Sequence, residues 1–156
     1  MNKIYLQNYV IRTGTGSGTD KLAAFDRALI SAGVSNYNII KVSSILPPNC
    51  KQQSKILLLK GSILPSAFEA IYSNKIGNII SASVGIGIPS NNDNIGVIMK
   101  YSSFSKKNES EKFVRELVVQ AMQDREIPFS EILSVAVECS VVTDKFYCAF
   151  ATVSMW

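Results

Sequence analysis

The stretch NIISASVGIGIP, residues 78–89, decides how this chain folds. In an extended strand its side chains alternate strictly between two faces. One face is apolar and the other holds only serine and glycine; the apolar set is Ile80, Ala82, Val84, Ile86 and Ile88, and the small set is Ser81, Ser83, Gly85 and Gly87. The apolar face predicts a strand over a hydrophobic core. The small face indicates that another element packs very close to it.

Further strands are predicted on both sides of this stretch. Runs rich in Ile, Val and aromatic residues, several of them bounded by Gly, Pro or Asn, predict strands at residues 3–11, 38–42, 55–60, 95–101, 131–138 and 145–155. Residues 14–19, GTGSGT, are predicted to form a flexible turn; their spacing does not match the phosphate-binding glycine motifs. The segment 63–73 is ambiguous between helix and strand.

Two amphipathic helices complete the prediction. The first, KLAAFDRALISA at 21–32, has Asp20 as its N-cap and Gly33 as the residue that ends it. The second runs from Ser105 to about Arg125, before Pro128. Its apolar stripe is Phe113, Val114, Leu117, Val118 and Ala121. Many strands with two such helices predict an α+β layered fold in a single domain, residues 1–156.

Composition excludes several classes of function. The chain has 156 residues, a net charge of +4 and no histidine. Without histidine there is no Ser-His or Cys-His nucleophile pair and no His-ligated metal, so we expect no metal site. The basic residues are scattered among acids, and the N-terminus lacks a long apolar segment, so we expect neither nucleic-acid nor membrane binding. Three cysteines without CxxC spacing indicate free thiols in the cytoplasm.

Asp26 interrupts the apolar stripe expected for the first helix. At 100° per residue that stripe consists of Leu22, Phe25, Leu29 and Ile30, with Asp26 in its middle. A carboxylate there is expected to be desolvated and to need a partner. Two interpretations remain open at this point. One is an internal salt bridge; the other is a pocket floor for a cationic ligand, with guanidinium as the best geometric match.

Ser43 and Ser44 lie just before Pro47-Pro48 in KVSSILPPN, residues 41–49. The Ser44 hydroxyl can attack the Ser43 carbonyl and convert the amide into an ester, if the backbone is held in a strained geometry and the oxyanion is stabilised. The prolines stiffen the chain beyond Ser44. An ordinary surface turn is the alternative for this motif taken by itself.

Residues 24–48, AFDRALISAGVSNYNIIKVSSILPP, resemble the N-terminal signature of the pyruvoyl-dependent arginine decarboxylases. The similarity continues through ISASVGIGIP, GVIMKY, SKKNESEKFVREL, SVAVE and CAFA to Trp156. The resemblance implies an αββα sandwich that cleaves itself into a β chain, 1–43, and an α chain, 44–156. It also implies a homotrimer, or a dimer of trimers, of αβ protomers with active sites between neighbours.

The same resemblance assigns roles to individual residues. Ser44 is the precursor of a covalent pyruvoyl cofactor, Ser43 is the cleavage site and Asn38 assists the cleavage. The pyruvoyl ketone forms a Schiff base with the amine of arginine and takes up electrons as CO2 leaves, so that agmatine is the product. Asp26 binds the guanidinium beside the apolar Leu22 and Leu29.

Two positions depart from the family pattern. Lys100 stands where the family has the glutamate presumed to reprotonate the substrate carbon, and Ser35 stands where the family tends to have glycine at the pocket. A lysine with a lowered pKa can donate a proton; Tyr101 and Glu69 are other candidate acids. A solvated charge on a strand is the alternative interpretation of Lys100. Functional alternatives are therefore a non-catalytic homologue that acts as a partner subunit or ligand binder, or a pyruvoyl enzyme for a different amino acid.

Overall fold

The structure is a computed structural model that describes residues 4–156. This part of the chain forms two helices and nine strands in one compact domain: β1 (Asn8–Gly18), α1 (Lys21–Ala32), β2 (Asn38–Lys41), β3 (Ile45–Leu46), β4 (Lys51–Gln52), β5 (Ile63–Ser73), β6 (Ile79–Pro89), β7 (Gly96–Ser103), α2 (Lys107–Asp124), β8 (Phe129–Ser140) and β9 (Phe146–Met155). The strands build a five-stranded sheet in the order β2-β5-β9-β1-β4 and a four-stranded sheet in the order β3-β7-β6-β8.

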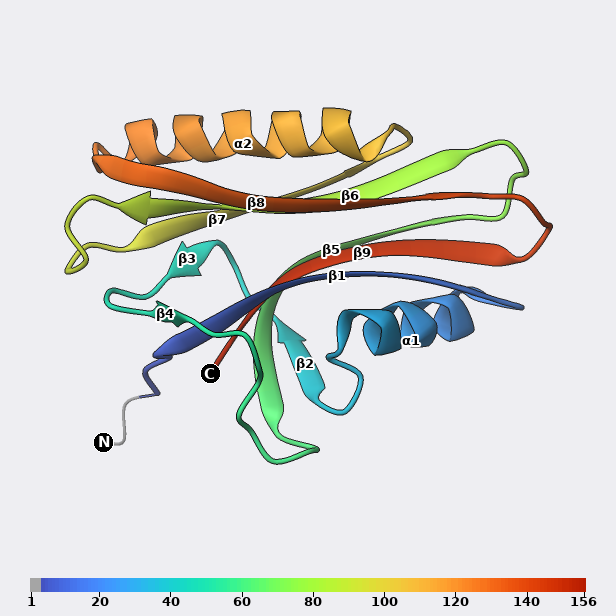
Figure 1. Cartoon of the computed structure of the whole chain (residues 1–156), viewed down its shortest axis with the longest axis horizontal. Coiled ribbons are helices and arrows are strands. Elements are labelled where there is room, and N and C mark those ends of the chain that lie inside the picture. The colour runs from blue at the N-terminus through green and yellow to red at the C-terminus, as the bar shows by residue number, and fades with distance from the viewer. Residues whose placement is uncertain (1–3) are drawn as a thin grey trace.

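The elements stack in four layers, with α2 on the outside of the four-stranded sheet and α1 on the outside of the five-stranded sheet (Figure 1). This arrangement confirms the αββα sandwich. The main core lies between the sheets, where buried β6 residues such as Val84 and Ile86 pack with Ala149 and Ala151 of β9. No helix in the described range, 4–156, is long and apolar enough to cross a membrane.

The small-residue face of β6 lies directly under α2, as its serine and glycine content indicated. Ser83 Oγ and Ser110 Oγ of α2 are 2.9 Å apart and both residues are buried. A Cβ atom added at Gly87 would lie 2.7 Å from Cγ of Met122, so a larger residue does not fit without movement. The apolar stripe of α2 is confirmed for Val114, Val118 and Ala121, which are buried. Phe113, at 42% exposure, instead stacks against Tyr101 at the margin.

The prediction of a flexible turn at residues 14–19 was wrong, because Gly14 to Gly18 belong to β1 and pair with β9. The glycines face α1, which lies almost on the backbone of the strand. A Cβ atom at Gly16 would be 2.4 Å from the carbonyl oxygen of Ala24, and one at Gly14 would be 2.2 Å from that of Ala28. These glycines are therefore required for close packing of helix on strand rather than for a turn.

Helix α1 begins and ends where the sequence predicted. The Asp20 side chain accepts a hydrogen bond from Ala23 N at 2.8 Å, and Gly33 adopts a left-handed conformation with φ of 76°. The predicted apolar face of α1 is only partly confirmed: Phe25 and Leu29 pack against the core, but Leu22 is 76% exposed, and the buried residues of the helix are Ala24, Ala28 and Ala32. The helix turns its smallest residues to the sheet because the glycines of β1 allow so close an approach.

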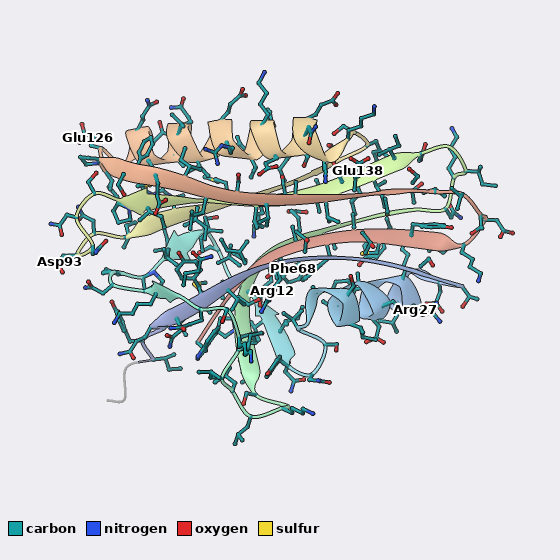
Figure 2. All side chains as sticks on the ribbon, in the orientation of Figure 1. Arg12, Arg27, Phe68, Asp93, Glu126 and Glu138 are labelled. Atoms are coloured by element: carbon teal, nitrogen blue, oxygen red, sulfur yellow. The ribbon has the colours of Figure 1, made fainter. Side chains whose placement is uncertain are left out.

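Several further segments differ from the predictions or were left open by them. The segment 55–60, KILLLK, is not a strand, and Leu57 and Leu59 are exposed. The ambiguous segment 63–73 is the long strand β5, which lies between β2 and β9. Strand β1 begins at Asn8 rather than at residue 3, and α2 spans Lys107–Asp124 rather than 105–125. Phe68 of β5, labelled in Figure 2, packs with Phe25 and Phe150 on the α1 side.

Candidate active site

The Ser43-Ser44 junction crosses from one sheet to the other. Strand β2 is an edge of the five-stranded sheet and β3 is an edge of the four-stranded sheet, so residues 42–44 connect the two layers (Figure 1). Both ends of this crossing are held by backbone hydrogen bonds. Val42 N donates to Ser66 O at 3.1 Å, and Ile98 N donates to Ser44 O at 2.8 Å. The bond between the two serines is therefore the link between two independently anchored edges.

The segment after the junction is fixed as well. Ile45-Leu46 forms the short strand β3 against β7, and Leu46 is buried at 3% exposure. The hydroxyl of Tyr5 donates to the carbonyl oxygen of Pro48. Ser43 is exposed and Ser44 is half-buried, so the junction is accessible to water while its flanks are held.

Lys100 lies at this junction. It follows Ile98 by two positions on β7 and so faces the layer between the sheets, as Ile98 does. Its Nζ donates to the carbonyl oxygen of Val42 at 3.4 Å, one residue before Ser43. Burial lowers the pKa of Lys100 and the charge of Lys41 lowers it further, whereas the charge of Glu69 opposes the change. Lys100 is half-buried, with one hydrogen bond to the protein backbone.

Glu69 was named from the sequence as a candidate acid, but only the fold gives it a position. On β5 it lies between Ala67 and Ile71, both of which pack into the core between the sheets. Ser102 Oγ on β7 donates to its Oε2 at 3.4 Å. The signal in the sequence was a charged residue within the segment 63–73, which was ambiguous between helix and strand. Once that segment is a strand, alternation directs Glu69 toward β7.

Tyr101 points away from the junction. It occupies the other face of β7, where its ring lies 4.4 Å from the ring of Phe113 on α2. Of the candidate acids, this leaves Lys100, which contacts the Val42 carbonyl, and Glu69, whose charge acts on Lys100. A strand presents alternate residues to opposite layers, and for that reason neighbours in sequence differ completely in surroundings.

The remaining predicted site residues form a second group around α1. Asp26 is exposed on α1 beside the exposed Leu22, while Leu29 and Ser35 are half-buried. The expectation of a desolvated Asp26 is thus wrong for the single chain. Asn38 opens β2, and its Nδ2 donates to Gly61 O at 2.7 Å. Five residues of extended chain, roughly 16 Å, separate it from Ser43. One chain therefore presents the junction and the α1 group as separate features.

Comparison with known proteins shows the family of this chain. The family model described as pyruvoyl-dependent arginine decarboxylase matches residues 8–155. The chain belongs to the family of pyruvoyl-dependent arginine decarboxylases. Proteins named pyruvoyl-dependent arginine decarboxylase from Methanococcus aeolicus and Methanocaldococcus jannaschii are each 38% identical over 143 residues, which is 92% of this chain and 86% of the relative. One from Thermococcus kodakarensis is 35% identical, over 94% of this chain and 92% of the relative.

A pyruvoyl-dependent arginine decarboxylase carries a covalently bound pyruvoyl group as its cofactor. The residues of this chain fit such a group. Ser44 stands where two anchored edges meet, and the Lys100 amine lies beside the carbonyl of Val42, one residue before Ser43. No separate binding pocket for a diffusible cofactor is needed, because the group is made from the backbone itself. The absence of histidine from the sequence is consistent with a cofactor of this origin.

Proposed function

We propose that this chain cleaves itself between Ser43 and Ser44 and then decarboxylates arginine to agmatine and CO2. The observation that carries the proposal is the anchoring of the junction at both ends in a member of this family. Attack of Ser44 Oγ on the Ser43 carbonyl converts the amide into an ester. Elimination then releases Ser43 as a carboxylate, and hydrolysis of the product at residue 44 releases ammonia and leaves the pyruvoyl group.

Cleavage at this point is compatible with the fold. The proposed β chain, 1–43, contributes β1 to the interior of the five-stranded sheet, where it pairs with β9 from Tyr9 to Gly18. Helix α1 covers the same sheet through the packing of Gly14 and Gly16. The proposed α chain, 44–156, keeps both sheets through β5 to β9. Breaking one bond at the sheet edges therefore leaves these contacts in place.

When formed, the pyruvoyl group supplies a carbonyl that reacts with the substrate amine and withdraws electrons as CO2 departs. The protein has to supply a proton to the carbon that has lost CO2. We assign this role to Lys100, whose Nζ lies at the junction. Burial lowers its pKa, which makes the ammonium a better acid than a solvated lysine.

We assign guanidinium recognition to Asp26, with Leu22, Leu29 and Ser35 around it and Asn38 assisting cleavage. Asp26 is exposed next to Leu22, which is 76% exposed, and Ile30, which is 59% exposed. Apolar side chains beside a carboxylate on the free face of a helix favour contact with another protomer. A homotrimer or dimer of trimers, in which α1 of one protomer completes the site of its neighbour, unites the two groups. We expect the assembly to act in the cytoplasm.

Intact mass spectrometry under denaturing conditions tests the cleavage. We expect two fragments, 1–43 and 44–156, with the second lighter by one ammonia than the unmodified peptide. Ser44→Ala should give a single uncut chain. Ser90→Ala, at an exposed serine in the turn between β6 and β7, is the matched control and should cleave normally. A single chain in the wild-type protein would overturn the self-cleavage.

Release of CO2 from carboxyl-labelled arginine tests the activity of fully cleaved protein. We expect release with arginine and a large loss in Asp26→Asn. Acidic and other basic amino acids serve as competing substrates. If cleaved protein releases CO2 from none of them and Lys100→Glu restores release from arginine, the chain is a repurposed homologue. Release from an acidic amino acid alone would assign a different substrate.

A further inference from the structure

Glu69 is a carboxylate in apolar surroundings. Its neighbours on the inner face of β5, Ala67 and Ile71, pack into the core between the sheets. A carboxylate in such a layer is costly unless a hydrogen bond or an opposite charge compensates it. Both are present on β7, where Ser102 Oγ donates to Glu69 at 3.4 Å and Lys100 lies within reach of its charge.

Lys100 has an equally specific electrostatic environment. The charged groups that act on it are Lys41, the last residue of β2, and Glu69 of β5. Its own strand adds none beside it, because Ile98 and Ser102 are uncharged. Lys41 is itself placed over the ring of Phe68, with its Nζ 4.9 Å from the ring centroid. Glu69 is thus the group that opposes the repulsion between the two lysines.

We propose that Glu69 is a positioning residue for the decarboxylation: its carboxylate keeps the Lys100 ammonium protonated and directed at the Ser43-Ser44 junction, so that β5 and β7 together form the proton-donating unit. This inference rests on the proposed function. The proton passes from Lys100 Nζ to the substrate carbon that has lost CO2; an N–H bond breaks, a C–H bond forms, and neutral Lys100 regains a proton from water.

The pair also reduces the charge conflict with a cationic substrate. A lone ammonium at the junction would repel the guanidinium of arginine, whereas a carboxylate in the same layer offsets part of that positive charge. Glu69 accepts a hydrogen bond from Ser102, the next residue on the Lys100 face of β7, and its charge acts on Lys100. The sequence separation of 31 positions conceals this pairing.

The test is Glu69→Gln, which keeps the size of the side chain and removes its charge. Its first readout is the titration of the Lys100 ammonium, followed by NMR of 13C-methylated lysines, with the signal assigned through Lys100→Arg. Removing the negative charge disfavours the ammonium, so the pKa of Lys100 should fall. This readout is made in the cleaved enzyme and in uncut Ser44→Ala, and it does not depend on activity.

The second readout is the pH profile of kcat/KM with arginine. The activity that requires the ammonium should disappear at a lower pH in Glu69→Gln, with a loss of roughly tenfold at pH 9 and little change at pH 6. Glu69→Asp, which retains the charge, should recover most of the loss. Glu116→Gln, at an exposed position of α2, is the matched control and should leave both readouts unchanged.

A third comparison is a double-mutant cycle. Because the two residues act as one unit, Lys100→Gln and the double variant Lys100→Gln/Glu69→Gln should have the same kcat/KM within about twofold. An unchanged Lys100 titration in active Glu69→Gln, or equal losses in Glu69→Asp and Glu69→Gln, would overturn the inference alone. Failure of cleaved wild-type protein to release CO2 from arginine would overturn the proposed function, whatever the titration shows.

Discussion

Both helices of this protein pack against a row of small residues on a strand, but α1 lies much closer to its strand than α2 does. On β1 the small residues are Gly14, Gly16 and Gly18 under α1; on β6 they include Gly85 and Gly87 under α2. Under α1 the atom nearest to an added methyl group would be a backbone oxygen at 2.2 Å for Gly14 and at 2.4 Å for Gly16, and the Cβ atom of Ala23 at 2.6 Å for Gly18. Under α2 it would be a side-chain carbon of Val118 or Met122 at 2.7–3.0 Å.

The difference arises from the helix residues rather than from the glycines. Helix α1 buries Ala24, Ala28 and Ala32, whose single methyl groups let the two backbones touch. Helix α2 buries Val114, Val118 and Met122, which hold its axis further away. A strand with alternating glycines therefore allows close packing of a helix only when the helix residues that cover it are also small. Four substitutions test this comparison, and all are best measured in uncut Ser44→Ala so that unfolding involves one chain.

Gly16→Ala should have the largest effect. Its Cβ atom would lie 2.4 Å from Ala24 O and 2.5 Å from Ala28 N, so α1 as a whole must move. We expect the free energy of unfolding to fall by about 3 kcal/mol, measured by urea denaturation at constant protein concentration. A loss below about 1 kcal/mol, smaller than that of overpacked cores, would show that α1 shifts easily and that the comparison is mistaken.

The second-largest effect is expected at alkaline pH, which should destabilise the packing on the α1 side of the five-stranded sheet. Cys148 is fully buried there, and burial raises the pKa of its thiol from 9.0 to about 12. The folded protein thus keeps the thiol neutral while the unfolded chain ionises above pH 9, so this stabilisation is complete below pH 9 and is lost as the pH rises toward 12. Between pH 8 and 10.5 the ionisation of this one thiol in the unfolded chain should lower the free energy of unfolding by about 2 kcal/mol.

Cys148→Ala tests this assignment through the change of the free energy of unfolding with pH rather than through its absolute value. The variant should be less stable at neutral pH but should lose less of its free energy of unfolding between pH 8 and 10.5. Ser90→Ala, at an exposed position that carries no thiol, is the control and should keep the wild-type slope. Equal slopes in wild type and Cys148→Ala would contradict the prediction.

Gly87→Ala should have an intermediate effect. The added Cβ atom would lie 2.7 Å from Cγ and 2.9 Å from Sδ of Met122. A methionine side chain has three rotatable bonds and can adapt, so we expect a loss of about 1 kcal/mol in the free energy of unfolding. A loss as large as that of Gly16→Ala would mean that the seam under α2 is as rigid as the seam under α1.

Gly85→Ala should be nearly neutral. Its closest neighbour would be Cγ2 of Val118 at 3.0 Å, which can give by a few tenths of an ångström. The smaller loss of backbone entropy for alanine in a strand offsets the crowding, so the free energy of unfolding should change by less than about 0.5 kcal/mol. The same urea titration measures it, and a loss above 2 kcal/mol would refute the distinction between the two helices.

The alternation in 78–89 predicted a two-faced strand under a helix, and the caps of α1 at Asp20 and Gly33 were predictable from local chemistry. The errors at 14–19 and on the face of α1 share one cause. Glycine in isolation favours a turn and leucine favours burial, yet both preferences were overridden when α1 and β1 came into contact. The strand predicted at 55–60 is absent from the structure: Ile56 and Leu58 pack against the core cluster on the α1 side, while Leu57 and Leu59 stay exposed.

The same division holds for the candidate site. Sequence alone determined the local chemistry: a Ser43-Ser44 bond before two prolines, no histidine, and a lysine at 100. These are properties of residue type and close spacing, which the chain carries before it folds. Only the tertiary structure decided that the Ser43-Ser44 bond links two sheet edges, that Lys100 meets the Val42 carbonyl, and that Glu69 faces it from another sheet. Such contacts depend on strand order, register and the alternation of faces, which are settled by the packing of layers far apart in sequence.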